Sequence, residues 1–331
     1  MYVRLNSPPL KDEHLEDEHV EGEHLEEETL ESVVAIDVGG SHVSAATYNF
    51  RARQLGEVHE IPISLTAAAD EFMDALVSLC RAAESGIVGG LSIAMPNPFD
   101  YQHGISYMTH KLKSLYGIDL RHGLSARLQC EAESIHFLND AAAYLIGEVY
   151  QGAARGVDRV VVITLGTGIG SAFATGGEVA GSGPGVPAGG EIWNLPYREG
   201  IVEDWAGTAA IQRLHLEATG EHASVRDIAA AAGEGNPAAR ETFARFGRDL
   251  GKLLHFATAD FAPQRIVIGG GIARSAHLFL ADAQGEVAEL GIELRVSELS
   301  DRAPLIGAAI AWKRHHSDSG KQATPPAGAV L

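Results

Sequence analysis

The sequence predicts an α/β protein made of two similar halves, each with a glycine-rich turn between two strands. Residues 33–38 form a short β-branched apolar run that ends at Gly39-Gly40, and residues 159–165 form a second run that ends at Gly166. Short apolar runs that stop at glycine are typical of buried strands followed by tight turns. Returning strands are predicted over 43–50 and 171–175. Because the pattern occurs twice, we expect an internal duplication with a ligand cleft between the halves.

The rest of the chain alternates helix and strand. Apolar residues at helical spacing predict a helix over 66–84, and Pro96 ends the strand predicted over 87–95. The other elements predicted are a strand over 134–139, a helix over 140–150, helices around 204–218, 225–233 and 237–259, a strand over 265–268, and helices over 272–283 and 303–314.

These elements predict a domain organisation in four parts. Residues 1–31 are an acidic, disordered N-terminal extension, and residues 32–138 are an N-terminal α/β domain completed by the helix over 303–315. Residues 139–302 are a C-terminal α/β domain, and residues 316–331 are a disordered tail. The extension repeats an acidic pentamer that contains histidine, which favours a solvated tail and leaves weak divalent-metal binding as the alternative.

Composition excludes several classes of function. The net charge is −19, which argues against nucleic acid because phosphate backbones require an excess of Lys and Arg. Cys80 and Cys130 are the only cysteines, and two thiols in apolar surroundings are typical of a reduced cytosolic protein. The N-terminus is too acidic for a targeting peptide, and no apolar run reaches membrane length. We therefore expect a cytoplasmic protein that binds neither nucleic acid nor membrane.

The glycine turns suit phosphate groups, because glycine lets consecutive backbone N–H groups converge on phosphate oxygens. The turn after residue 268 also precedes a predicted helix N-terminus, which favours a nucleotide phosphate. The cofactor-binding candidates are Gly39, Gly40, Ser41, Gly166, Thr167, Gly168, Gly269, Gly270 and Gly271. Asp37 ends the first strand, where it could hold Mg²⁺ through water. The sequence lacks a Gly-x-x-x-x-Gly-Lys-Ser/Thr motif, which excludes a P-loop NTPase.

Asp140 is the candidate general base. It stands where a predicted strand meets a predicted helix, so it could accept a hydroxyl proton during phosphoryl transfer or could act only as a helix N-cap. Carboxylates and amides pair with sugar hydroxyls, and the candidates for this role are Asn139, Glu191, Asn194 and Glu203. Trp193 and Trp205 could offer an apolar face to a sugar ring, although core packing explains a tryptophan equally well.

In these motifs the chain resembles the ROK family of sugar kinases and sugar-responsive regulators, within the actin-like ATPase superfamily. The resemblance covers residues 32 to about 315. Its motifs, in order, are Ala35-Ile-Asp-Val-Gly-Gly-Ser41, Leu138-Asn-Asp-Ala-Ala-Ala143, Thr164-Leu-Gly-Thr-Gly-Ile-Gly170, Ile268-Gly-Gly-Gly-Ile272 and Leu305-Ile-Gly-Ala-Ala309. The resemblance implies duplicated RNase H-like domains, ATP with Mg²⁺, a homodimer, Asp140 as the base, and sugar binding by Asn139, Glu191 and Glu203.

The chain departs from the family pattern mainly at the sugar end. Asn194 stands where many members have a histidine, and the cysteine-rich zinc element is missing because no cysteine follows Cys130. We therefore expect no structural zinc held by thiolates. Ser41-His42 replaces the usual Thr-Lys of the first phosphate motif.

The expected function is ATP-dependent phosphorylation of a hexose or related sugar hydroxyl. The alternatives are a catalytically silent protein that binds sugar and nucleotide, and a regulator of the same family, although residues 1–31 are too short for its DNA-binding domain. Polyphosphate as the donor is disfavoured by the acidic body of the chain.

Overall fold

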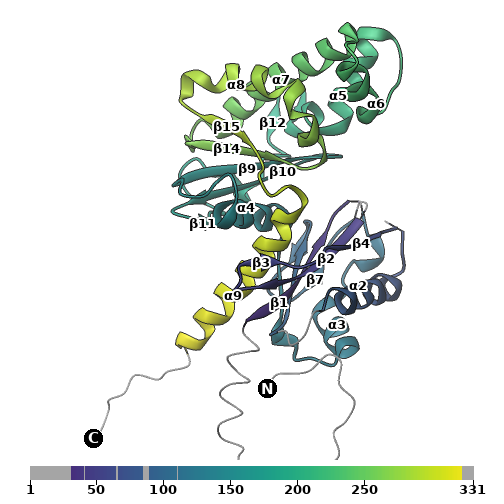
Figure 1. Cartoon of the computed structure of the whole chain (residues 1–331), viewed down its shortest axis with the longest axis vertical. Helices are drawn as coiled ribbons and strands as arrows, with labels where there is room; N and C mark the ends of the chain where they lie inside the picture. Colours follow the sequence, from purple (N-terminus) through teal and green to yellow (C-terminus); the bar gives the residue numbers. More distant parts are fainter. Residues whose placement is uncertain (1–30, 41, 65, 85–88, 110, 323–331) are drawn as a thin grey trace, which may run out of the picture. The chain divides into compact units, whose positions relative to one another are not determined.

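The computed structural model describes residues 31–40, 42–64, 66–84, 89–109 and 111–322, which form two compact units (Figure 1). Unit 1 comprises the chain up to Ala143 and from Pro304 onward, and unit 2 is Tyr144–Ala303. The observed divisions, 143/144 and 303/304, lie five residues and one residue after the expected positions, 138/139 and 302/303. The proposed extension, except for Glu31, and the last nine residues lie outside the described residues. Residues 316–322, which we assigned to a disordered tail, continue the last helix.

Unit 1 contains a six-stranded sheet in the order β3-β2-β1-β5-β8, with β4 also paired to β2. Strands β1 and β2 form an antiparallel hairpin, whereas β5 and β8 continue the sheet in parallel. The strands are β1 (Ser32–Val38), β2 (His42–Asn49), β3 (Gln54–Leu55), β4 (His59–Pro62), β5 (Leu91–Met95) and β8 (Ile135–Asn139). A separate hairpin joins β6 (Phe99–Asp100) to β7 (Ile105–Ser106).

Helices cover the unit 1 sheet through apolar residues. Side chains of α2 (Ala69–Ala83) and α3 (Leu120–Leu128) share one core with the inward-facing residues of β1, β5 and β8. Helix α9 (Ala303–Gln322) also packs on this unit, where the buried Trp312 donates its indole N–H to the Ser134 carbonyl at 3.0 Å. Sequence reasoning missed α3, although Leu120, Leu124 and Leu128 recur at helical spacing after the capping residue Asp119.

Unit 2 repeats the arrangement of strands. Its five-stranded sheet has the order β11-β10-β9-β14-β15, in which β9 and β10 form an antiparallel hairpin and β14 and β15 continue in parallel. The strands are β9 (Arg159–Leu165), β10 (Ile169–Thr175), β11 (Glu178–Val179), β14 (Arg265–Gly269) and β15 (Glu293–Val296). The series β10-β9-β14-β15 therefore matches β2-β1-β5-β8 of unit 1, which confirms the predicted duplication.

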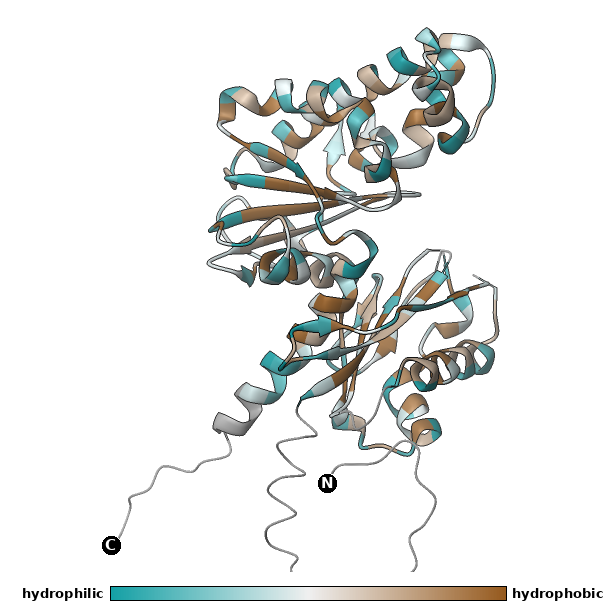
Figure 2. Ribbon diagram, viewed as in Figure 1, coloured by the Kyte–Doolittle hydropathy of each residue, from teal (hydrophilic) through white to brown (hydrophobic). Residues whose placement is uncertain are grey.

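Helices lie on both faces of the unit 2 sheet. Figure 1 shows α7 and α8 on one face and α4 on the other. The helices are α4 (Asp140–Gln151), α5 (Gly207–Thr219), α6 (Val225–Gly233), α7 (Pro237–Thr258) and α8 (Leu280–Val287). The hydrophobic colouring of Figure 2 follows the central strands β9 and β14, which are buried almost throughout. A sheet covered in this way has near-continuous apolar strands, as the sequence predicted.

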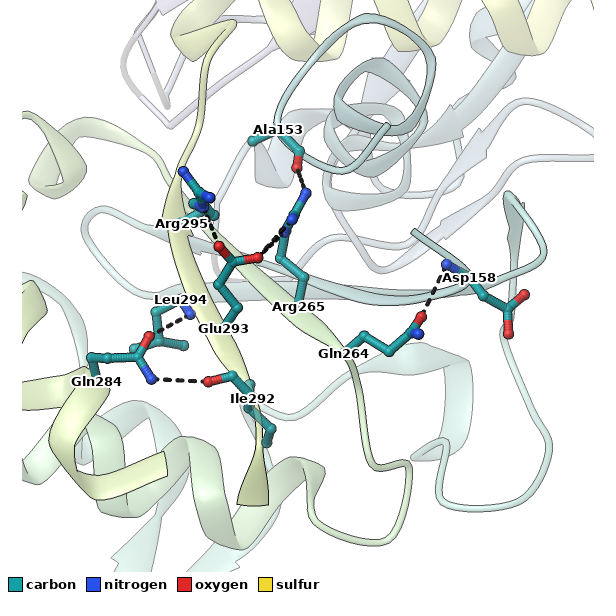
Figure 3. Close-up of polar contacts among 9 residues, drawn as sticks. All are labelled: Ala153, Asp158, Gln264, Arg265, Gln284, Ile292, Glu293, Leu294 and Arg295. Atoms are coloured by element: carbon teal, nitrogen blue, oxygen red, sulfur yellow. Dashed lines mark hydrogen bonds and ion pairs between the residues drawn. The ribbon is translucent and has the colours of Figure 1, made fainter. Parts of the chain in front are cut away.

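Polar side chains hold the outer strand β15 in register. Arg265 contacts Glu293 Oε2 through two nitrogens, at 2.6 and 2.8 Å, and donates to the Ala153 carbonyl at 2.5 Å (Figure 3). The Gln284 amide bridges the Ile292 carbonyl and the Leu294 N–H, at 2.9 and 2.8 Å. These contacts lie at the start of β14 and β15, away from the glycine turn that ends β14.

The helix predicted over 272–283 is not continuous. The structure has a 3₁₀ segment, η5 (Gly271–Leu278), followed by α8, with Phe279 between them in a non-helical conformation. The Phe279 ring is buried, with its centroid 5.3 Å from that of Phe246. The predicted helix is thus interrupted at the residue whose ring packs into the core, which local periodicity does not reveal.

Acid should destabilise unit 1 through His136. Burial, aided by His315, His316 and Arg121, lowers the pKa of His136 from 6.5 to about 3. Between these values the unfolded chain binds a proton that the folded chain does not, so stability present above pH 6.5 is lost as the pH falls. This residue should account for a loss of about 2 kcal/mol between pH 7 and pH 5.

The measurement is the free energy of unfolding at both pH values for the wild type and for His136→Asn. The asparagine cannot titrate and retains a polar group near Ser92 Oγ, which lies 3.3 Å from His136 Nδ1. The variant should lose less stability on acidification than the wild type. Equal losses in the two proteins would show that His136 is not responsible.

Candidate functional site

Two groups of predicted site residues lie at the carboxyl edge of the unit 1 sheet. Strands β1, β5 and β8 are parallel, and their register aligns Asp37 with Ala94 and Ala94 with Leu138. Two strand spacings therefore separate Asp37 from the end of β8, a distance of about 10 Å. The fold thus brings Asp37, Asn139 and Asp140 to one edge of the sheet, where ligands of open α/β sheets bind.

Asn139, rather than Asp140, caps helix α4. Its Oδ1 accepts the Ala142 N–H at 3.0 Å, which satisfies one of the N–H groups that a helix leaves unpaired in its first turn. Asp140 is the first helical residue, and its Oδ1 accepts the Ala141 N–H at 2.9 Å. Asn139 therefore takes the capping role that the sequence left open for Asp140.

Sequence reasoning missed a polar cluster beside Asn139. The Asn139 amide donates to the Tyr101 hydroxyl at 3.3 Å, and this hydroxyl lies 2.6 Å from Asn97 Oδ1 and 3.0 Å from the Met95 carbonyl. These contacts fix the Asn139 amide at the head of α4. Asn97 stands two residues after the end of β5, so its place at the same sheet edge as Asn139 could have identified it.

The first glycine turn closes the β1–β2 hairpin. The Gly39 N–H donates to the His42 carbonyl at 3.0 Å, so this group is already used inside the turn. Gly40 is exposed, with open space where a side chain would begin. Ser41, the third predicted residue of this turn, lies outside the described residues.

The backbone carbonyl oxygens and N–H groups of the second glycine turn point to opposite sides. We call these sides its acceptor face and its donor face. The carbonyl oxygens of residues 166, 167 and 168 lie within 3.1 Å of the position that a Cβ on Gly207 would occupy. Because C=O and N–H point in opposite directions across a trans peptide, the N–H groups of residues 167–169 point away from Gly207. Thr208, in the first turn of α5, donates its N–H to the Gly166 carbonyl at 2.9 Å and so holds the acceptor face.

One N–H group of the donor face, that of Ile169, is already bound to a side-chain carboxylate, that of Glu203. Glu203 Oε2 lies 3.3 Å from the Ile169 nitrogen and accepts its N–H. A Cβ on Gly168 would approach the same oxygen to 2.2 Å, so a side chain at this position would require the Glu203 carboxylate to move. A turn with an N–H group bound to a carboxylate has the donor chemistry that phosphate oxygens need. The structure therefore places Glu203, expected among the sugar ligands, against the second glycine turn.

The third glycine turn lies against the second. In the sheet, Gly269 is aligned with Thr164, and the Gly270 backbone approaches Leu165 so closely that a Cβ would lie 2.4 Å from its carbonyl oxygen. Gly270 also has a φ of +81°, a conformation that glycine adopts without strain. The turns at 166–170 and 269–271 thus leave one sheet edge together, as a common nucleotide site requires.

Tyr144 packs behind the third turn. A Cβ on Gly269 would lie 2.4 Å from its hydroxyl oxygen, so a side chain at this position is excluded. Burial raises the pKa of Tyr144 to about 12, so this hydroxyl stays neutral near pH 7. The turn leads into the 3₁₀ segment η5 and not into the α-helix expected there, which removes the regular helix dipole from the argument for nucleotide binding.

The candidate sugar-binding residues of unit 2 lie on a loop that hydrogen bonds hold to β10. The buried Ser171 hydroxyl donates to the Gly190 carbonyl at 2.7 Å and accepts the Ile192 N–H at 3.0 Å, and these bonds hold the residues on both sides of Glu191. Glu191 Oε2 accepts the Trp193 indole N–H at 2.9 Å. Ser171 is a further residue that sequence reasoning missed.

This loop brings Glu191 and Glu203 into one region. The Glu203 N–H donates to the Trp193 carbonyl at 3.0 Å, so the segment that carries Glu191 is bonded to the one that carries Glu203. The Asn194 side chain is exposed beside Trp193. Of the four sugar-end candidates, Glu191, Asn194 and Glu203 thus share one loop region of unit 2, whereas Asn139 belongs to unit 1.

Asp37 is the candidate metal ligand. Mg²⁺ in phosphate-transfer sites keeps several waters and takes only one or two protein carboxylates, so a single aspartate at a sheet edge fits it. No group of three His, Cys, Asp or Glu side chains suited to a metal occurs among the described residues. Among the described residues, every helix is too short or too polar to span a membrane.

The duplicated sheets, with glycine turns at their carboxyl edges, define a two-unit α/β protein of the actin-like class. The sequence profile of the ROK family matches residues 33–315. The chain therefore belongs to the ROK family, and the resemblance seen in its motifs is confirmed.

Two relatives of similar length are sugar kinases. The glucokinase of Thermotoga maritima is 24% identical over 307 residues, which cover 84% of this chain and 96% of that protein. The N-acetylmannosamine kinase of Escherichia coli O139:H28 is 28% identical over 304 residues, which cover 84% and 97%.

A solved structure confirms the fold. The ROK family glucokinase from Streptomyces griseus, crystallised with glucose and AMPPNP, superposes with a TM-score of 0.72 at 22% sequence identity. The superposition covers 85% of this chain and 98% of that one. The expected actin-like ATPase fold is therefore correct.

The contact of Gly270 with Leu165 can be tested by adding one methyl group. Gly270→Ala should lower the free energy of unfolding by about 2–4 kcal/mol, because its Cβ would meet the Leu165 backbone and its φ would be strained. Gly271→Ala is the matched control, since nothing lies within 4 Å of its Cβ position, and it should change stability by less than about 1 kcal/mol. Equal effects in a denaturant titration would refute this close approach.

Proposed function

We propose that this protein transfers the γ-phosphoryl group of ATP to a hydroxyl of a hexose or related sugar, with Asp140 as the general base. The observation that carries the proposal is the arrangement of side chains at the head of α4. Asn139 caps the helix, and Asp140 occupies the first helical position at the carboxyl edge of the sheet. Membership of a family that includes sugar kinases supports the same reaction.

In the proposed reaction Asp140 accepts the proton of the attacking hydroxyl. The sugar oxygen forms a bond to the γ-phosphorus, the bond from that phosphorus to the β,γ-bridging oxygen breaks, and ADP leaves. Asn139, Glu191, Asn194 and Glu203 pair with sugar hydroxyls and orient the acceptor. Tyr101 serves as a positioning residue, since it holds the Asn139 amide.

The glycine turns would hold the nucleotide. Backbone N–H groups of residues 167 and 168 suit phosphate oxygens, whereas the Ile169 N–H is already bound to Glu203. The adjoining turn at 269–271 would hold the nucleotide beside them, as its resemblance to the ROK motif implies. Asp37 would hold Mg²⁺ through water. When bound, the ion neutralises charge on the β- and γ-phosphates.

Replacement of the base should abolish turnover without abolishing nucleotide binding. Asp140→Asn should reduce sugar-dependent ADP release by about 10²–10⁴-fold, because amides do not accept the proton. A coupled ADP-release assay should be run first on the wild type with a panel of hexoses, amino sugars and N-acyl sugars, and then on the variant. Binding of a non-hydrolysable ATP analogue to the variant should stay within threefold of wild type.

Asp119→Asn is the matched control, because Asp119 caps α3 in the same unit and asparagine also caps helices. It should leave turnover within twofold of wild type. Wild-type turnover in Asp140→Asn would refute the proposed base. Sugar binding without ADP release by the wild type would favour the second candidate, a silent ROK-like binding protein or regulator, which the replacement of the family histidine by Asn194 also supports.

A further inference from the structure

A cluster of aromatic and cationic side chains stands next to Glu203. It consists of Tyr197, Arg198, Trp205, Arg213 and Asp249, and we call it the Trp205 cluster. The guanidinium carbons of Arg198 and Arg213 lie 4.3 and 4.9 Å from the centroid of the Trp205 ring. A guanidinium within about 6 Å of a tryptophan face is attracted by the negative face of the ring. Trp205 therefore receives two such contacts.

The cluster joins three parts of unit 2. Arg198 lies in the turn of the hairpin β12 (Pro196–Tyr197) and β13 (Gly200–Ile201), Arg213 lies on α5, and Asp249 lies on α7. The Arg198 guanidinium is 2.9 Å from Asp249 Oδ1, and this aspartate side chain is only 19% exposed. Such a partly buried ion pair is screened less than one at the surface, so it anchors the hairpin to the long helix α7.

The cluster continues directly into the turn that carries Glu203. This turn is the 3₁₀ segment η4 (Val202–Trp205). The Asp204 carboxylate accepts the Ile201 N–H at 2.9 Å, and Arg213 donates to the Asp204 carbonyl at 2.8 Å. Both ends of η4 are thus held, one by this cap and the other by the Trp205 ring.

We propose that the Trp205 cluster positions Glu203 against the second glycine turn, residues 166–170. In this sequence Glu203 follows a segment without cysteine, so thiolate ligands of a metal are not available to hold it. The cluster fixes η4 through side-chain contacts alone, and η4 directs the Glu203 carboxylate to the Ile169 N–H at 3.3 Å. The effect on catalysis rests on the proposed function, whereas the position of Glu203 does not.

The test is amide exchange at Ile169, measured by hydrogen-exchange mass spectrometry on peptides that span residues 166–170. Trp205→Leu removes the π face, and it should speed exchange at Ile169 at least tenfold. Trp205→Phe keeps an aromatic face and should restore the rate to within threefold of wild type. The control is Arg245→Ala, which breaks an exposed ion pair with Glu217 in the same unit and should leave this exchange unchanged.

A kinetic readout separates positioning from stability. In Trp205→Leu the KM for sugar should rise at least tenfold, while the KM for ATP changes less than threefold. A variant that melts earlier but retains wild-type Ile169 exchange and sugar KM would overturn the inference. If Trp205→Leu does not fold, Arg213→Met tests the same point, because it removes one guanidinium and the contact to Asp204 but keeps a helix-forming side chain.

Chelation gives an independent outcome. Wild-type protein treated with EDTA and dialysed should keep its melting temperature and its Ile169 exchange. Loss of either property that added Zn²⁺ restores would overturn the inference, since a metal would then hold η4. If the wild type releases no ADP with any sugar, the proposed function fails, and Ile169 exchange in the Trp205 variants still decides whether the cluster positions Glu203.

Discussion

The parallel pairing of β9 with β14 is the interaction on which the candidate nucleotide site depends. It aligns Gly269 with Thr164, so that two glycine turns far apart in sequence leave the sheet at the same edge. The backbones then approach so closely at Gly270 and Leu165 that no side chain fits. The adjoining position of the two turns follows from this pairing, whereas the contacts of Gly207 and Thr208 orient the donor face of the second turn.

The same constraint operates in unit 1 with different chemistry. There the parallel strands β1, β5 and β8 bring carboxylates and amides, rather than glycine turns alone, to the sheet edge. The Asn139 amide is fixed by the helix it caps and by Tyr101, which leaves Asp140 at the helix start. Duplication of one fold therefore supplies two adjoining glycine turns in one copy and a candidate base in the other.

Sequence patterns predicted the elements whose causes are local. The strands over 33–38 and 159–165 were found because β-branched runs ended at glycine, and the matching strand order confirms the duplication. The break at Phe279 and the contact of Glu203 with Ile169 were not predicted, because each depends on groups distant in sequence. The Trp205 cluster was missed for the same reason, since its members come from a hairpin, the segment η4 and two helices.

Phosphorus NMR on the complete reaction tests the central claim most directly. Purified protein would be incubated with ATP, Mg²⁺ and each sugar of a panel that includes glucose and N-acetylmannosamine. The account predicts a new phosphomonoester signal with at least one sugar, in amounts equal to the ADP formed. Formation of inorganic phosphate alone, or no product with any sugar, would contradict it.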